Sequence, residues 1–218
     1  GMMPVDGETL WNNTWYNDPV FFGYYPEEGL AAYGKHIPEF ASTDFEVISQ
    51  PIDFLGLNIY TAERTRSDES GGWQEVPSPP GTPRTAMEWK VNEECLYWGT
   101  KFQAERYGVP IYITEIGMAN LDWPQQDGRV RDPQRIDYLH RHLRSLKSAI
   151  DDGTDVRGYF QWSLLDNFEW AEGYRRRFGL IYVDFATGER IRKDSAAWYR
   201  NVIETNGRSL FDTGSNVV

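Results

Sequence analysis

The 218-residue sequence predicts an α/β fold in which short parallel strands alternate with helices. Three runs rich in apolar, β-branched and aromatic residues, at 53–61, 109–117 and 158–170, each lead into polar or acidic side chains. Helical patterns lie between and after these runs. Neither an internal repeat nor an interdomain linker interrupts the pattern, so we expect residues 1–218 to form a single domain.

The first strand is predicted at residues 53–61, which read DFLGLNIYT. Successive side chains of a strand point to opposite faces, so Asn58 and Tyr60 are expected on the same face. Taken alone, an Asn-x-Tyr pair is more often structural than catalytic. Residues 67–85 follow as a long loop, because three glycines and four prolines interrupt any regular pattern there.

Helices are predicted at 93–107, 133–152 and 195–205. Asp132 is the expected N-cap of the second helix, which has a proline in its first turn and ends at Gly153. Its aliphatic residues recur three and four positions apart and predict one buried stripe. The stripe consists of Ile136, Leu139, Leu143, Leu146 and Ile150.

The second strand is predicted within residues 109–117, which read VPIYITEIG. Its β-branched and aromatic residues suit a short buried parallel strand. Glu115 then stands at the mouth of a βα unit, just before the Gly117 turn. A lone carboxylate there is usually a surface charge or a helix cap, so its position alone does not make it catalytic.

The third run, GYFQWSLLDNFEW at 158–170, changes from a buried-strand pattern to polar side chains set among tryptophans. Asp166, Asn167 and Glu169 carry groups that can hydrogen-bond sugar hydroxyls. Trp162 and Trp170 offer flat apolar faces to the C–H surfaces of a pyranose. A core strand running into an acidic surface loop is the alternative.

Together these three strings resemble family 1 glycoside hydrolases, the β-glucosidases, and the resemblance extends from about residue 16 to 204. It implies a partial (β/α)8 TIM barrel that comprises roughly strands six to eight with their helices. Residues 2–5 would be a stub of strand five. The length agrees, because a complete barrel of this kind takes about 250 residues.

The resemblance also implies roles for individual residues. Glu115 matches the nucleophile that forms a covalent glycosyl-enzyme ester, and Tyr60 matches a tyrosine that hydrogen-bonds it. Asn58 would support the same polar network. The residues implied to bind substrate are Trp162 as a sugar platform, Glu169 and Trp170 on the distal hydroxyls, Phe178 as an aromatic wall and Trp89 near the aglycone entrance. The loop at 67–85 would border that entrance or be a disordered surface excursion.

Other parts of the sequence depart from the family pattern. The acid/base motif ending in Asn-Glu-Pro does not occur; the nearest string, at 92–94, lacks the proline. Ile116 replaces the usual asparagine beside the nucleophile, and residues 87–96 differ around Trp89. We therefore expect a truncated or engineered fragment.

Three functions fit this sequence. The first is the nucleophile-bearing half of a retaining β-glucosidase, acting on a β-linked glucoside or related sugar with an acid/base from elsewhere. The second is a catalytically inactive sugar-binding or structural scaffold. The third, which is the weakest, is a stand-alone hydrolase with Asp166 or Glu172 as its acid.

Composition excludes several function classes. A net charge of −11 and a pI near 4.8 argue against nucleic acid and anionic membranes as partners. No apolar run reaches the roughly 18 residues that span a bilayer, and no signal peptide is recognised. Cys95 is the single cysteine, which excludes an intrachain disulfide and suits the cytoplasm. No metal or cofactor is expected, because His140 and His142 point in different directions on one helix.

An incomplete barrel also predicts a partner. Cutting the closed sheet leaves strand edges unpaired and exposes inward-facing residues such as Phe160 and Trp162. We therefore expect either a homodimer or a complementing N-terminal barrel fragment to cover this surface.

Overall fold

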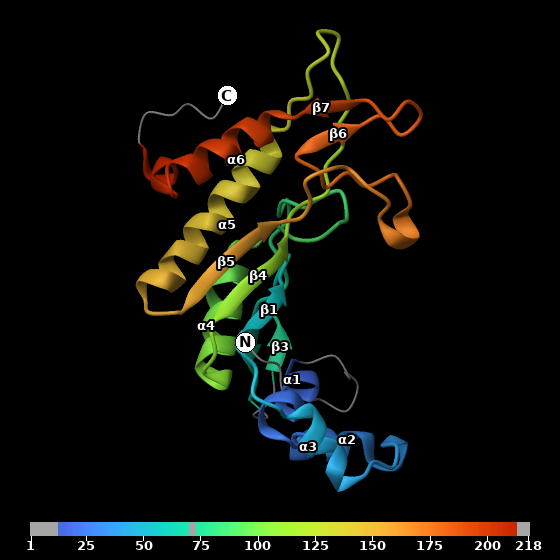
Figure 1. Ribbon diagram of the computed structural model, residues 1–218, viewed down its shortest axis with the longest axis vertical. Helices are drawn as coiled ribbons and strands as arrows, with labels where there is room; N and C mark the ends of the chain where they lie inside the picture. Colours follow the sequence, from blue (N-terminus) through green and yellow to red (C-terminus); the bar gives the residue numbers. More distant parts are fainter. Residues whose placement is uncertain (1–12, 70–72, 213–218) are drawn as a thin grey trace.

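The computed structural model of the protein describes residues 13–69 and 73–212, and within them the fold is α/β (Figure 1). A parallel sheet of three strands lies at its centre in the order β1-β4-β5. Its strands are β1 (Leu55–Asn58), β4 (Ile111–Ile116) and β5 (Val156–Gln161). β1 and β4 fall within the first two predicted runs, whereas β5 begins two residues before the third run, at 158–170, and covers only its start.

Helices connect these strands, as expected for parallel pairing. α4 (Glu94–Tyr107) precedes β4, and α5 (Pro133–Asp151) joins β4 to β5. The predicted loop at 67–85 is partly wrong. β2 (Thr65–Ser67) and β3 (Trp73–Glu75) form an antiparallel pair at its start, while residues 70–72 lie outside the described part of the chain.

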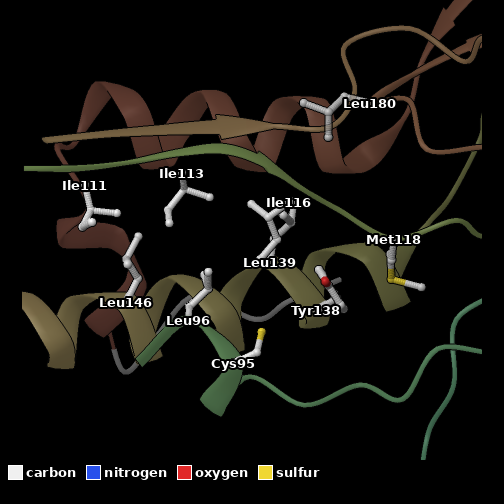
Figure 2. Close-up of a cluster of buried hydrophobic side chains, with 10 residues drawn as sticks. All are labelled: Cys95, Leu96, Ile111, Ile113, Ile116, Met118, Tyr138, Leu139, Leu146 and Leu180. Atoms are coloured by element: carbon white, nitrogen blue, oxygen red, sulfur yellow. The ribbon is translucent and has the colours of Figure 1, made fainter. Parts of the chain in front are cut away.

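The core lies between one face of the sheet and helices α4 and α5. Figure 2 shows Leu96 of α4 and Leu139 and Leu146 of α5 pointing towards Ile111 and Ile113 of β4. All five side chains are buried. Each such side chain contributes about 1.5–3 kcal/mol when it leaves water, so this layer fixes the sheet against its helices.

The opposite face of the sheet is open to solvent. Phe54, just before β1, is 50% exposed, and Phe160 of β5 is 58% exposed. In a closed barrel such positions would face a packed interior. Within the described residues β1 and β5 each pair with a neighbour on one side only. The sheet is therefore an open segment rather than a closed barrel.

The start of α5 differs from its sequence prediction. Asp132 is the N-cap residue, but its side chain makes no capping hydrogen bond to α5. Its carboxylate instead accepts from the Ser195 backbone N–H at 2.9 Å and from the Ser195 hydroxyl at 2.6 Å. Asp132 thus closes the first turn of α6 (Asp194–Glu204) and ties two helices together.

The predicted apolar stripe of α5 is also only partly right. Ile136, Leu139 and Leu146 are buried, whereas Ile150 is 39% exposed. The buried face continues through polar and small side chains that a count of aliphatic residues overlooks. They are Arg135, Tyr138, His142 and Ala149, spaced three, four and seven apart.

The rest of the chain lies at the two ends of the molecule (Figure 1). After β5 come η2 (Trp170–Glu172), the hairpin of β6 (Ile181–Val183) and β7 (Arg190–Arg192), α6 and η3 (Arg208–Phe211). The N-terminal group consists of α1 (Asn13–Phe22), α2 (Glu27–Tyr33), η1 (Gly34–His36) and α3 (Ser42–Ile48).

Asp18 of α1 is buried and attaches the N-terminal group to α4. Its carboxylate accepts from Arg106 Nε and from the Tyr107 hydroxyl, both at 2.8 Å. The predicted stub of strand five, residues 2–5, lies outside the described residues. None of the described helices combines the length and apolar character needed to cross a membrane.

Candidate active site

Glu115 and Tyr60 meet at the carboxyl ends of two neighbouring strands. The ladder between β1 and β4 shifts register between Leu57 and Asn58, and its last contact is the Ile59 N–H donating to the Glu115 carbonyl at 3.0 Å. One residue further, the Tyr60 hydroxyl donates to Glu115 Oε2 at 2.7 Å. The two residues are 55 apart in sequence, so parallel pairing is what joins them.

The Tyr60 phenol is a permanent hydrogen-bond donor at neutral pH. Burial is the largest effect that raises the pKa of Tyr60 far above its usual value, and the Glu115 carboxylate beside it adds to the rise. The Glu169 carboxylate acts in the same direction through its charge. The protonated phenol therefore donates its hydrogen bond to the Glu115 carboxyl group.

Two further aromatic rings surround this pair. The Trp89 ring lies 5.1 Å from the Tyr60 ring and 6.1 Å from the Phe178 ring, and Phe178 lies 6.2 Å from Tyr60. Phe178 is only 2% exposed. It supports the other two rings from behind and offers no open face of its own.

Asn58 lies beside the site but does not bind Glu115 directly. In the register of the sheet its Cα is opposite that of Glu115. Its side chain is exposed, and Asn58 Oδ1 accepts a hydrogen bond from the Thr114 hydroxyl at 2.7 Å. Asn58 therefore joins the polar network through Thr114, the residue that precedes Glu115.

The end of β5 passes very close to the segment after Glu115. The Trp162 N–H donates to the Ile116 carbonyl at 2.7 Å, and the Trp162–Ser163 peptide is cis. A Cβ on Gly117 would lie 1.8 Å from the Trp162 carbonyl oxygen. Only glycine fits at position 117, so the backbone just after Glu115 can lie against the backbone of Trp162. This close contact holds the half-buried Trp162 next to the Glu115 segment.

Glu169 and Trp170 lie together at the start of η2, on an exposed turn. The Glu169 N–H donates to the Gly173 carbonyl at 2.7 Å, and Trp170 is 83% exposed. The structure thus joins Tyr60, Glu115, Trp89 and Phe178 in one cluster. The Glu169 carboxylate lies near enough to act on Tyr60 through its charge, while the next residue, Trp170, lies largely in solvent.

Asp166 does not have the role that the sequence predicted, either as a sugar ligand or as an acid. It is 3% exposed, and its carboxylate binds Arg177 Nη1 at 2.7 Å and Lys193 Nζ at 2.8 Å. The Gly179 N–H donates to the same carboxylate at 2.9 Å. A buried carboxylate that is engaged by two cations and a backbone donor is out of reach of a substrate, so Asp166 does not offer a free acid.

The other two polar residues of this region are also engaged within the protein. The Asn167 amide donates to the Ser163 hydroxyl at 3.1 Å and to the Leu165 carbonyl at 3.0 Å, so it shapes the loop rather than offering a free amide. Glu172 pairs with Arg176 at 2.8 Å and with Arg175 at 3.2 Å. The stand-alone hydrolase with Asp166 or Glu172 as acid therefore loses both of its candidates.

Sequence reasoning missed a buried charge cluster beneath these loops. Asp122, which follows β4, binds both Arg135 Nη2 and Lys193 Nζ at 2.6 Å. Lys193 also reaches Asp166, so one ammonium joins the loop after β4 to the loop after β5. These side chains are wholly buried. Their signal in the sequence is weak, because the acidic and basic partners come from four distant segments.

The histidines diverge as predicted. His140 Nε2 lies 3.0 Å from the Leu210 carbonyl, whereas His142 Nδ1 lies 2.7 Å from the Tyr138 carbonyl. Among the residues that the structure describes, no three histidine, cysteine, aspartate or glutamate side chains are grouped to hold a metal ion.

A surface hollow of about 440 Å³ lies away from this cluster. It is lined by Val109 and Pro110 before β4 and by Asp155 and Arg157 at the start of β5. In barrel folds the catalytic residues occupy the carboxyl ends of the strands, whereas the amino ends serve stability. We therefore place the candidate site at Tyr60 and Glu115, not at this hollow.

Comparison with known proteins shows what the chain is similar to. The sequence profile described as Glycosyl hydrolase family 1 matches residues 3–208. Beta-glucosidase A of Thermotoga maritima is 44% identical over 191 residues, which cover 87% of this chain and 43% of that protein. A bifunctional beta-D-glucosidase/beta-D-fucosidase of Bifidobacterium breve is 42% identical over 215 residues, covering 89% of this chain and 46% of the relative.

A solved structure shows the same relation. The beta-glucosidase from Thermotoga maritima in complex with glucoimidazole superposes with a TM-score of 0.81 at 44% identity. The match covers 90% of this chain and 44% of that chain. The chain thus spans less than half the length of the relatives that it matches.

Proposed function

Because the chain belongs to glycosyl hydrolase family 1, we propose that it carries the nucleophile of a retaining β-glucosidase. The observation that supports this most directly is the 2.7 Å hydrogen bond from the Tyr60 hydroxyl to Glu115 Oε2. The bond holds one carboxylate oxygen and leaves the other for attack. β-Glucosidic substrates are proposed from the names of the relatives, which are beta-glucosidases.

The proposed reaction begins with attack of a Glu115 oxygen on the anomeric carbon. A carbon–oxygen ester bond forms while the bond to the glycosidic oxygen breaks, and the leaving group departs with its electron pair. Water then attacks the anomeric carbon, and the bond from that carbon to the Glu115 oxygen breaks. The water's proton passes to the departed leaving-group oxygen or to the acid/base, the sugar leaves with inverted configuration at that step, and the carboxylate is restored. Two inversions give net retention. Tyr60 orients Glu115 throughout.

The sugar would rest against Trp162 and be held at its distal hydroxyls by Glu169 and Trp170. The high exposure of Trp170 leaves its ring free to meet a ligand. Trp89, with Phe178 packed behind it, would form the wall near the aglycone. Asn58 would act through Thr114, which it contacts.

In the proposed barrel, β1, β4 and β5 correspond to strands six, seven and eight of a single domain at residues 1–218. The general acid/base would then lie outside this chain, because Asn-Glu-Pro is absent from the sequence and Asp166 and Glu172 are engaged elsewhere. A retaining glycosidase needs its second carboxyl about 5 Å from the first. A complementing N-terminal fragment would supply it. A homodimer would only cover the open face, since a second copy has the same residues.

A sugar-binding or structural scaffold without turnover is the second candidate. The open sheet face, with Phe54 and Phe160 half exposed, favours it, because an incomplete barrel need not hold a substrate in reactive geometry. The two candidates differ in one observable property, namely whether Glu115 forms a covalent ester.

Intact mass spectrometry after incubation with dinitrophenyl 2-deoxy-2-fluoro-β-glucoside tests the proposal. This activated substrate needs little acid assistance, so a correctly placed nucleophile can be labelled without the acid/base. We expect one fluoroglucosyl adduct on the chain and none on Glu115→Gln. No adduct on either protein would favour the scaffold, unless an added N-terminal barrel half restored labelling.

A further inference from the structure

We propose that Tyr138 is a positioning residue for the nucleophile. Its hydroxyl holds the backbone carbonyl of Tyr60 so that the Tyr60 phenol reaches Glu115. The effect on catalysis rests on the proposed function, in which Glu115 is the nucleophile. The effect on structure, that the Tyr138 hydroxyl sets the position of Tyr60, can be tested without catalysis.

The segment at 60–62 needs support because it has left the sheet. β1 ends at Asn58, and the last backbone hydrogen bond to β4 is made by the Ile59 N–H. The chain is then irregular up to Thr65, where β2 begins. A tyrosine on irregular backbone can hold a carboxylate at 2.7 Å only if other contacts fix its main chain.

Tyr138 provides one of these contacts at Tyr60 itself. Its hydroxyl donates to the Tyr60 carbonyl at 2.9 Å, from the buried face of α5. The Tyr138 side chain is 1% exposed. His142, one turn further along α5, stacks on its ring at 3.8 Å between centroids, and its Nδ1 lies 2.7 Å from the Tyr138 carbonyl. The ring that presents the hydroxyl is therefore itself held in place.

Two more contacts fix the residues that follow. The Asn92 amide donates to the Ala62 carbonyl at 3.0 Å, and the Thr61 hydroxyl donates to the Lys90 carbonyl at 2.7 Å. These bonds join residues 60–62 to the segment that carries Trp89. The Tyr60 phenol and the Trp89 ring are thus positioned as a unit. Tyr138 is the member of this unit that comes from α5, the helix between β4 and β5.

A merely structural tyrosine would contribute through its ring, which packs in the core cluster. The two roles separate in Tyr138→Phe, because phenylalanine keeps the ring and removes only the hydroxyl. Tyr107→Phe is the matched control. Tyr107 is also buried, and its hydroxyl donates to Asp18 at 2.8 Å in the contact between α1 and α4. Both variants lose one buried hydroxyl donor.

The first readout is the rate of fluoroglucosyl labelling, followed by intact mass. We expect Tyr138→Phe to slow labelling by about five- to tenfold, the effect of losing one hydrogen bond that places the nucleophile. Tyr107→Phe should keep the rate within about twofold. Equal rates in Tyr138→Phe and the parent chain would overturn the inference, and so would equal slowing in both variants.

The second readout is NMR of the chain with ¹³C-labelled tyrosine, in which Tyr60→Phe assigns the Tyr60 ring signal. We expect this signal to shift in Tyr138→Phe and to stay in place in Tyr107→Phe. An unmoved Tyr60 signal in Tyr138→Phe would overturn the inference. If the parent chain takes no label even with an added N-terminal barrel half, the proposed function fails, and the NMR result still decides whether Tyr138 positions Tyr60.

Discussion

At the scale of single residues, the surroundings of each titratable group decide what it can do. Glu115 and Asp166 both stand near the carboxyl end of a sheet strand, yet only Glu115 remains partly accessible beside a neutral donor, Tyr60. Asp166 is enclosed by Arg177 and Lys193. The accessible carboxylate is the one that we propose as the nucleophile, whereas the enclosed one holds loops together.

His142 shows the same dependence on surroundings. It is fully buried in the core face of α5, and burial lowers its pKa to about 4. The unfolded imidazole has a pKa of roughly 6.5, so the unfolded chain takes up this proton first as the pH falls. Protonation therefore favours unfolding. The contribution of neutral His142 to the free energy of unfolding is fully present above about pH 6.5. It is lost progressively as the pH falls towards 4.

We expect this group to lower the free energy of unfolding by about 3 kcal/mol between pH 6.5 and pH 4. Urea unfolding at several pH values measures the slope. His142→Phe retains an aromatic ring to stack on Tyr138. In this variant the slope of the free energy of unfolding against pH should correspond to one proton fewer taken up on unfolding. The parent chain is the reference. An identical slope in His142→Phe and the parent chain would contradict this expectation.

At the scale of elements, α5 is the helix that organises the site. Its buried face combines aliphatic packing at Leu139 and Leu146 with polar contacts at Arg135, Tyr138 and His142. The aliphatic part fixes the helix against β4. The polar part reaches the charge cluster below the loops and the backbone of Tyr60. A substitution on this face is therefore expected to affect both stability and the site.

Asp132 tests the link between α5 and α6. Asp132→Ala would leave the buried Arg135 with one carboxylate fewer and remove both acceptors of Ser195. We expect a loss of about 3–5 kcal/mol in the free energy of unfolding, the usual cost of breaking a buried ion pair. Chemical denaturation measures it. Asp137→Ala, which removes the exposed pair with Arg141 on the same helix, should cost less than about 1 kcal/mol.

At the scale of the whole molecule, the described chain has one covered and one open sheet face. Helices α4 and α5 bury the first, while Phe54 and Phe160 lie half exposed on the second. The strand edges at β1 and β5 add unpaired backbone groups to that open side. Exposed aromatic side chains next to free strand edges favour association with another polypeptide.

We therefore expect sedimentation velocity to show a homodimer, or a complex once an N-terminal barrel fragment is added. Phe160→Glu should raise the dissociation constant by about tenfold or more, because a buried aromatic contact is worth about 1.5–3 kcal/mol. Trp98→Glu, an exposed aromatic on the outer face of α4, should leave association unchanged. A compact monomer that ignores the added fragment would contradict this expectation.

Much of this arrangement could be predicted because it depends on local patterns. The β-branched runs predicted β1, β4 and β5. Capping residues and apolar periodicity predicted α5, and the ranges expected for α4 and α6 also agree to within about two residues. The motif resemblance identified the family. The β2–β3 hairpin was missed because its strands are three residues each, too short to show an alternating pattern.

The sequence by itself thus determined the α/β class, the family and the identity of Glu115 and Tyr60 as candidates, because those depend on residue order along a strand. Only the tertiary structure decided which charged side chains are available. Asp166, Asp122 and Lys193 come from separate segments and meet in a buried cluster. Their pairing reflects distance in space and loss of solvent, which no short pattern in the sequence encodes. The same holds for Tyr138, whose contact with Tyr60 spans 78 residues.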